Sequence, residues 1–245
     1  MGTRVRRRPP RAHWALLVLF SVVLLAELAF TGYVSHVGAE GSGPQPPSAT
    51  PGAAPPAITS GSAVQRIGPN GSITSRDMRA HTIALTFDDG PDPVWTPRIL
   101  AVLARYHAHA TFFQIGSRVN RYPELSRRVL AAGHEIGSHT FTHLDLAVAP
   151  RWQVDTELAM TDNAIAAATG RRPTLFRPPY SAGPDAVTAS QVPALRRAGA
   201  GHLIVLADRD TKDWRRPGAA AIAAAAQRSA GTGAVVLMHD SGGDR

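Results

Sequence analysis

The chain has 245 residues, 44% hydrophobic and 18% charged, which suits one large domain with a buried core and excludes a generally disordered chain. It contains no cysteine, so a disulfide framework, thiolate metal ligands and a cysteine nucleophile are excluded. The formal net charge of +8 would favour a nucleic-acid partner, but five arginines lie before residue 12 and the remainder carries only +3.

The first predicted element is a helix directed to a membrane. The five arginines precede an apolar run, and residues 12–37 contain one acidic residue, Glu27, and no lysine or arginine. A spanning helix needs about 20 mostly apolar residues, and basic flanks favour the cytoplasmic side. We therefore expect a cytoplasmic basic segment over 1–11 and a single-pass transmembrane signal anchor over 12–37, with the rest of the chain outside. The alternative is a cleaved signal peptide, with cleavage near Ala39 and a secreted chain.

A linker is predicted after this segment. Residues 38–80 begin with a stretch rich in proline and glycine, residues 41–56, that has no hydrophobic periodicity. Chains of this composition stay extended and mobile because they have little to bury. We expect a disordered linker over 38–80 and a folded domain over 81–245.

From His81 onward, short apolar runs alternate with helical patterns. Strands are predicted over 83–87, 110–115, 134–137, 175–176, 203–206 and 234–238, and helices over 96–106, 123–132, 151–169, 192–198 and 219–229. This alternation predicts an α/β fold with a parallel sheet or barrel. Polar clusters follow five of the strands, and in such folds sites form at the carboxyl ends of strands. The clusters are therefore expected to converge on one mouth.

Two of these clusters could hold a metal ion. The first strand ends in Asp88 and Asp89, which favours one carboxylate as a metal ligand and the other as a base, although a solvated turn has the same sequence. His139 and His143 are four residues apart, and on a helical turn both would face the same side. Two histidines and one carboxylate are a common ligand set for a catalytic metal with an open position.

The other three clusters are weaker signals when each is taken alone. Arg177-Pro-Pro-Tyr180 has a rigid backbone that suits holding an arginine and a backbone amide in place. Asp210-Thr-Lys-Asp213-Trp214 puts a carboxylate beside an indole, and Leu237-Met-His239 ends the last strand with a possible general acid.

In this order, the five segments resemble the polysaccharide deacetylase family, the NodB-homology domain of carbohydrate esterase family 4, over about residues 80 to 245. The resemblance implies a distorted (β/α) barrel that binds one divalent metal, zinc or alternatively cobalt. It also implies metal-dependent removal of N-acetyl groups from a polymeric amino sugar, such as peptidoglycan or a chitin-like polysaccharide.

The resemblance further implies roles for individual residues. By match of position, the metal ligands would be Asp89, His139 and His143. The general base would be Asp88, held by Arg177, and the general acid would be His239, oriented by Asp213. The backbone amide of Tyr180 would help hold the oxyanion, and Trp214 and Leu237 would line the acetyl pocket.

The chain departs from the family at its end. Family domains usually continue past the Leu-x-His strand with a further helix and strand, whereas this sequence stops six residues after His239. The expected barrel therefore lacks its last elements. A second catalytic domain after residue 245, as some exported relatives carry, is left open.

Three functions are compared. The membrane signal and the motifs together favour an exported, membrane-tethered deacetylase of cell-wall polysaccharide. A carbohydrate-binding protein without turnover is disfavoured by the presence of Asp88 and His239. A nucleic-acid binder is disfavoured because the basic residues cluster at the membrane flank without interleaved aromatics. The expected partners are an acetylated polysaccharide and the membrane.

Overall fold

The computed structural model describes residues 64–67, 73–76, 78–181, 183, 186–227 and 233–243. The predicted basic segment, transmembrane anchor and cleavage site near Ala39 all lie outside these residues. Within the described part of the chain, no helix is both long and apolar enough to cross a membrane. The anchor and its orientation therefore stay predictions.

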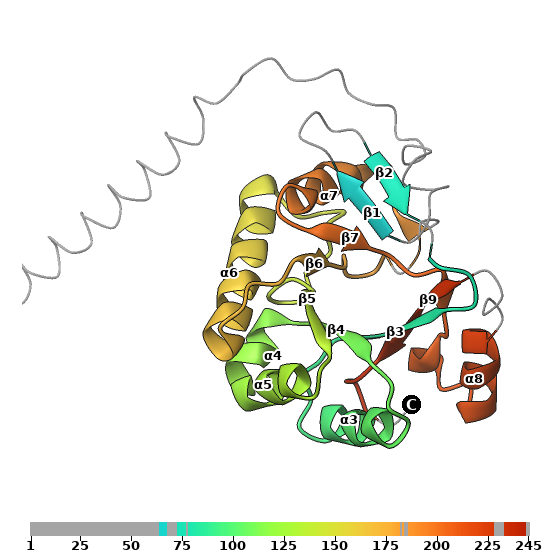
Figure 1. Ribbon diagram of the computed structural model, residues 1–245. Coiled ribbons are helices and arrows are strands. Elements are labelled where there is room, and N and C mark those ends of the chain that lie inside the picture. The colour runs from blue at the N-terminus through green and yellow to red at the C-terminus, as the bar shows by residue number, and fades with distance from the viewer. Residues whose placement is uncertain are drawn as a thin grey trace, which may run out of the picture. The chain divides into compact units, whose positions relative to one another are not determined.

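Strands and helices alternate from residue 83 onward, as the hydrophobic pattern predicts (Figure 1). The described strands are β1 (Val64–Ile67), β2 (Ile73–Arg76), β3 (Ile83–Asp88), β4 (Ala110–Gln114), β5 (Glu135–Ser138), β6 (Leu175–Phe176), β7 (Leu203–Val205), β8 (Arg209–Asp210) and β9 (Ala234–His239). The described α-helices are α3 (Trp95–Arg105), α4 (Gly116–Arg121), α5 (Pro123–Ala131), α6 (Arg151–Thr169), α7 (Val192–Gly199) and α8 (Ala219–Gln227), with short 3-10 helices η2 (Ala189–Gln191) and η3 (Asp213–Arg215).

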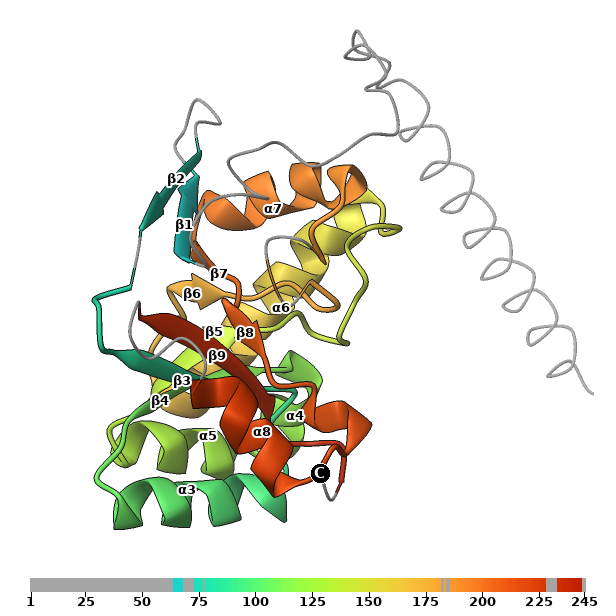
Figure 2. The ribbon, with the colours of Figure 1, turned by 90° about the vertical axis from the view of Figure 1, so that its right-hand side faces the viewer.

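The described strands form one nine-stranded sheet in the order β2-β1-β7-β6-β5-β4-β3-β9-β8. Strands β3 to β9 pair in parallel with their neighbours, whereas β1 pairs antiparallel with both β2 and β7. The sheet curls, and helices pack outside it, but β7 and β8 are not paired with each other (Figures 1 and 2). The architecture is an open, curled half-barrel, which agrees with the expected distorted α/β barrel.

The hairpin β1–β2 corrects the predicted linker. Val64 and Gln65 pair with Val205 and Ile204 of β7, and β2 pairs with β1, so residues 64–67 and 73–76 belong to the sheet and not to a linker that ends at residue 80. The sequence between the two strands, Gly-Pro-Asn-Gly, is a turn signal that could have revealed the hairpin. The linker prediction over 38–80 is wrong for this part, because alternating strand residues were taken as part of the polar tail.

Two buried hydrophobic clusters hold the sheet and helices together. Successive side chains of a strand point to opposite faces, and Phe112 and Phe113 of β4 accordingly join different clusters. Phe112 packs with Leu100 of α3 and Val129 of α5, while Phe113 packs with residues of α6, α7 and β9. Both phenylalanines are fully buried, so β4 is covered on both faces, as expected for a central parallel strand.

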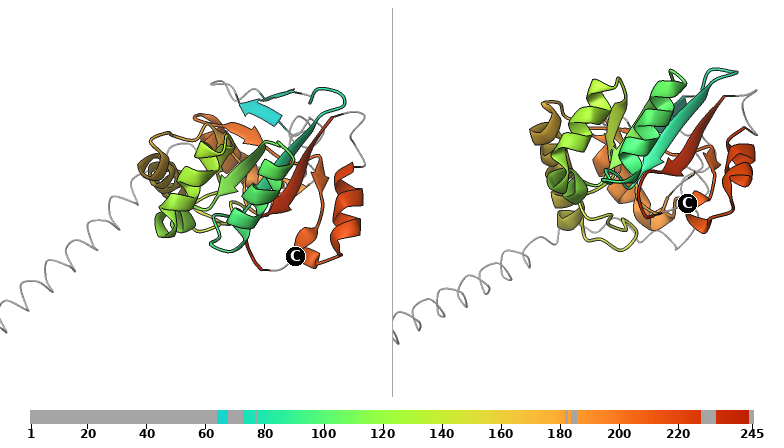
Figure 3. Two further views of the ribbon diagram at one scale, coloured as in Figure 1. Left: turned by 60° about the horizontal axis from the view of Figure 1, so that its bottom comes forward. Right: turned by 90° about the horizontal axis from the view of Figure 1, so that it is seen from below.

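Two helices differ from the others: α4 was not predicted, and α8 lies at one end of the sheet. Helix α4 was missed because it has only six residues between β4 and α5. Helix α8 lies beside β8 and β9, at the end of the sheet away from α6 and α7 (Figure 3). None of its residues is buried, although eight of the nine are alanine or isoleucine.

Candidate active site

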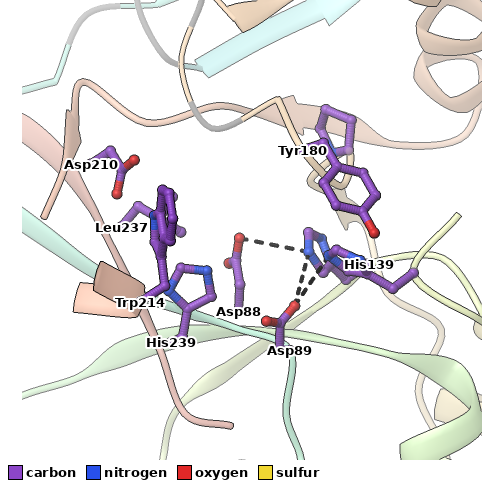
Figure 4. A pocket seen from close by; sticks show the side chains of 10 residues that line it. Asp88, Asp89, His139, Tyr180, Asp210, Trp214, Leu237 and His239 are labelled. Carbon is purple, nitrogen blue, oxygen red and sulfur yellow. Dashed lines mark ion pairs between the residues drawn. The ribbon is translucent and has the colours of Figure 1, made fainter. Parts of the chain in front are cut away.

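The polar clusters at the strand ends meet in one cavity, which confirms the expected convergence (Figure 4). Parallel pairing places the ends of neighbouring strands at the same edge, and Asp88 is the direct partner of His239 across β3 and β9. The cavity has a volume of about 380 Å³ and is lined by Asp88, Asp89, His139, His143, Pro178, Tyr180, Asp210, Trp214, Leu237 and His239.

One group of side chains in this cavity could hold a metal ion. Single ligand atoms of Asp89, His139 and His143 all lie within 4.8 Å of one another. Asp89 Oδ1 lies 3.6 Å from His139 Nε2 and 3.3 Å from His143 Nε2 (Figure 4). Two imidazole nitrogens and one carboxylate oxygen therefore point at a common position.

The backbone that brings the two histidines together differs from the expected helical turn. His139 follows directly after β5, and residues 139–143 form a loop. Thr140 and His143 have positive φ angles of 61° and 63°, as does Asp89 with 75°. The expectation of a helical i, i+4 pair is wrong. The two rings instead face each other because the loop turns through left-handed backbone conformations.

The three residues fit a divalent metal on their own chemistry. Asp89 Oδ1 is buried and has no hydrogen-bond partner among the described residues. His139 Nδ1 lies 2.8 Å from the carbonyl oxygen of Arg177, and as the donor it leaves the lone pair on Nε2 facing Asp89. The pKa of His143 is lowered, first by burial and then by the nearby His139, which favours the neutral ligand form. A set of two nitrogens and one oxygen suits zinc and similar transition metals.

Asp88 has a different partner from its neighbour. Its Oδ1 accepts a hydrogen bond of 2.8 Å from NH1 of Arg177, and its Oδ2 lies 3.8 Å from His139 Nε2. Arg177 is fully buried, and its guanidinium lies 4.2 Å from the ring centre of Phe113. The remaining donors of Arg177 go to Thr86 Oγ1 at 2.7 Å, to the Val205 carbonyl at 2.9 Å and to the Leu206 carbonyl at 3.2 Å. Because each of its three nitrogens donates at least one hydrogen bond, the arginine holds Asp88 in one position.

His239 and Asp213 form the second hydrogen-bonded pair. His239 Nδ1 lies 2.7 Å from Asp213 Oδ1, and the backbone amide of His239 donates to Asp213 Oδ2 at 2.8 Å. Burial acts to lower the pKa of His239, but the hydrogen bond to Asp213 and the nearby carboxylates outweigh it and raise the pKa. The ring therefore keeps a proton to higher pH than an ordinary histidine, which suits a general acid.

Two aromatic side chains stand at opposite sides of the cavity (Figure 4). Tyr180 is 67% exposed and its ring meets that of His143 at 4.5 Å, in an edge-to-face arrangement. Trp214 is 49% exposed and stands near Leu237, which is buried. The cavity thus has apolar walls at its two ends and charged groups between them.

The structure adds residues that the sequence did not single out. Thr86 Oγ1 accepts from Arg177 and donates to the carbonyl oxygen of Val236, so it ties the arginine to β9. Glu157 on α6 accepts hydrogen bonds from the amides of Phe141 and Thr142 at 2.7 and 2.8 Å. A signal for Glu157 was present, since helical spacing puts this acid on the same face as Val154 and Thr161, which are both buried.

Comparisons with known proteins agree with this geometry. The sequence profile of the family described as polysaccharide deacetylase matches residues 75–199. The chain is 39% identical over 163 residues to a peptidoglycan-N-acetylglucosamine deacetylase of Bacillus cereus, covering 66% of this chain and 74% of that one. It is 40% identical over 162 residues to a chitooligosaccharide deacetylase of Sinorhizobium fredii, covering 66% and 73% of the two chains.

Solved structures give the same relationship. A family 4 carbohydrate esterase from Streptomyces lividans in complex with acetate is 34% identical with a TM-score of 0.59, covering 67% of this chain and 81% of that one. A family 4 pseudoenzyme from Bacillus anthracis is 26% identical with a TM-score of 0.58, covering 66% and 56%. Because a pseudoenzyme shares the fold, the fold alone does not establish turnover, and the site residues have to carry that argument.

Proposed function

This chain belongs to the polysaccharide deacetylase family, and on that premise we propose that it hydrolyses N-acetyl groups of a polymeric amino sugar in a metal-dependent reaction. One observation carries the proposal. The group Asp89, His139 and His143 opens into the same cavity as the Arg177-held Asp88 and the Asp213-held His239. A ligand set, a base and an acid are the parts that metal-assisted amide hydrolysis needs.

Asp89, His139 and His143 would hold the metal, which we propose to be zinc, with cobalt as the alternative. When bound, the metal supplies Lewis acidity that polarises the amide carbonyl and activates the attacking water. Asp88, with its Oδ2 turned toward the same position, accepts the proton of that water. Arg177 holds Asp88 in place during the transfer.

The chain's other groups act on the carbonyl and on the leaving amine. As negative charge develops on the carbonyl oxygen, the backbone amide of Tyr180 donates a hydrogen bond to it. His239 gives its proton to the departing nitrogen, because an unprotonated amine leaves poorly, and Asp213 stabilises the ring while it carries charge. Trp214 and Leu237 enclose the acetyl methyl group. The products are acetate and the free amino sugar.

The presence of a paired base and a paired acid in the site favours catalysis over binding without turnover. Asp88 and His239 are both present, and each has the partner that prepares it for proton transfer. Relatives named as deacetylases of peptidoglycan or chitooligosaccharide support an acetylated glucosamine polymer as the substrate class.

For the location, we propose that the domain works outside the cell membrane, in reach of cell-wall polysaccharide. The support is the sequence of residues 1–37, with basic residues before an apolar run. A tethered enzyme meets the acetylated polymers of the wall and no cytoplasmic ones.

Acetate release from three substrates tests the proposed reaction: N-acetylglucosamine oligomers, peptidoglycan and acetylated xylan. We expect release from the first two, abolition by a chelator and restoration by zinc or cobalt but not by magnesium. His143→Ala should remove both the metal and the turnover. Full acetate release by His143→Ala in the presence of chelator would contradict the metal assignment.

A further inference from the structure

A second groove adjoins the catalytic cavity. It has a volume of about 480 Å³ and lies between the β8–η3 segment and helix α8, with Lys212, Arg215, Ala221 and Ala225 among its lining residues. Asp210 lines both this groove and the catalytic cavity, so the two lie next to each other. In Figure 4, Asp210 lies at the end of the cavity beyond Leu237, on the opposite side from His139 and Tyr180.

Three basic residues line the groove, Arg209, Lys212 and Arg215, and the last two are available to a ligand. Lys212 and Arg215 are exposed, and among the described residues neither forms an ion pair with a carboxylate. The guanidinium of Arg215 lies 4.6 Å from the ring centre of Trp214, which is itself a wall of the catalytic cavity. The positive charge is therefore held directly beside the place where the reacting sugar would bind.

Two carboxylates also line the groove, so its three basic residues leave it with one net positive charge. Asp208 Oδ2 accepts a hydrogen bond from the amide of Val235, and Asp210 Oδ1 accepts one from the amide of Lys212. The opposite wall is α8, whose sequence of alanine, isoleucine and one glutamine carries no charge. Ala221 and Ala225 are one helical turn apart, so they present a smooth apolar surface to the groove.

The order of charges along the groove sets what it can accept. Asp210, at the junction, repels an anion and can accept a hydrogen bond from a sugar hydroxyl. Lys212 and Arg215 attract an anion farther from the reacting centre. We infer that the groove is a subsite for a carboxylate carried by the glycan next to the reacting acetylated sugar.

This inference rests on the proposed deacetylase function and narrows its substrate class to acidic glycans such as peptidoglycan, in preference to neutral chitin-like chains. Two parts of peptidoglycan offer the carboxylate: the lactyl group of a muramic acid, or the peptide attached to it. The experiment separates these sources by its choice of ligand.

Lys212 is the only lysine in the chain, which permits a direct binding measurement. An amine-reactive ester will modify Lys212 and the amino terminus, and mass spectrometry will follow both, with the amino terminus as internal control. We expect a peptide-free glycan with lactyl carboxylates, or a peptide-bearing glycan, to slow labelling of Lys212. A neutral N-acetylglucosamine oligomer of equal length should slow it less. Equal protection by neutral and acidic oligomers would overturn the subsite.

Kinetics give a second readout, the ratio of kcat/KM for the acidic glycan to kcat/KM for the neutral oligomer. Lys212→Gln should lower this ratio roughly two- to fivefold, the size of one exposed ion pair, and raised salt should lower it in the unaltered protein. Arg105→Gln on α3, which removes an exposed charge away from the groove, is the matched control and should leave the ratio unchanged.

Equal losses for both substrates in Lys212→Gln would overturn the inference. The proposed function fails in a different way, through absence of acetate release from every oligomer by the unaltered protein. Labelling of Lys212 needs binding only, so it decides the subsite in either case.

Discussion

Asp88 and Asp89 are adjacent in the chain but have different neighbours: Asp88 is held by Arg177, while Asp89 faces two imidazoles. Asp88→Asn should therefore keep stoichiometric metal and lose roughly 10²-fold or more in kcat, the usual contribution of a positioned base. Asp89→Asn should lose metal affinity first. Metal analysis beside acetate release measures both effects.

The two substitutions are controls for each other, because each replaces one carboxylate oxygen by an amide nitrogen, at neighbouring positions. Metal loss in Asp88→Asn together with full metal in Asp89→Asn would mean that the two roles are reversed.

His239 predicts how the reaction depends on pH. Its pKa is raised because the hydrogen bond and charge of Asp213, with the other carboxylates of the cavity, outweigh burial. A general acid works while protonated, so kcat/KM should fall as pH rises through this raised pKa. Asp213→Asn removes one of the charges that raise the pKa, and its alkaline limb should move to lower pH. A pH profile of kcat/KM measures the shift. An unmoved limb in Asp213→Asn would assign the titration to another group.

Helix α6 supports the candidate metal loop through one side chain. Glu157 accepts from the amides of Phe141 and Thr142 and from the Thr142 hydroxyl at 2.8 Å, and these residues separate the two histidines. Without this acceptor the loop loses its anchor, so Glu157→Ala should lower metal affinity by about 10-fold or more, as substitutions behind metal ligands do. Chelator competition measures the affinity.

Two further variants make the Glu157 experiment specific. Thr156→Ala changes an exposed neighbour on the same helix and should leave metal affinity unchanged. Glu157→Gln keeps one acceptor oxygen and should recover part of the affinity. Equal affinity in Glu157→Ala and the unaltered protein would show that the loop holds its shape without α6.

The β1–β2 hairpin covers the edge of β7 in the described sheet. A chain beginning at residue 78 leaves that edge unpaired, which removes stability and creates a site for association between molecules. Compared with a chain beginning at residue 61, it should have a lower Tm, by about 2–4 °C for each kcal/mol lost. Thermal unfolding and size-exclusion chromatography test this. Identical Tm and a monomeric profile would mean that the hairpin is dispensable.

The proposed anchor predicts where the full chain is found. With five arginines before an apolar run, the anchor would have its amino terminus in the cytoplasm and the catalytic domain outside. With residues 64–67 and 73–76 in the sheet, the proposed connecting segment shortens to 38–63, and a flexible coil of that length averages roughly 25–30 Å. The domain would then reach only the nearest layers of the wall. An intact amino terminus in the membrane fraction supports the anchor. A mature chain starting at about Glu40 in the medium favours the cleaved signal peptide and leaves the chemistry untouched.

Local patterns in the sequence carried much of this protein's architecture and site. The pattern of apolar residues placed α6 at its observed bounds and β3, β5 and β9 within about a residue or two, because α6 buries one face and the strands contain runs of consecutive buried residues. The five motifs, read in order, indicated the family and contain all ten residues that line the cavity. Two adjacent aspartates at the end of a predicted strand can be recognised from the sequence alone.

Long-range pairing was not visible in the sequence. The turn sequence after residues 64–67 indicates a hairpin, but the pairing of this hairpin with the edge of β7, about 140 residues later, has no local signal. Two further features depend on how α6 packs. They are the hydrogen bonds from the loop of residues 139–143 to Glu157 and the left-handed backbone conformation of that loop. The cavity and the groove beside α8 share Asp210 because β8 pairs with β9, which brings Asp210 next to Leu237. Contacts of this kind are decided by the packing of distant segments, and no local pattern encodes them.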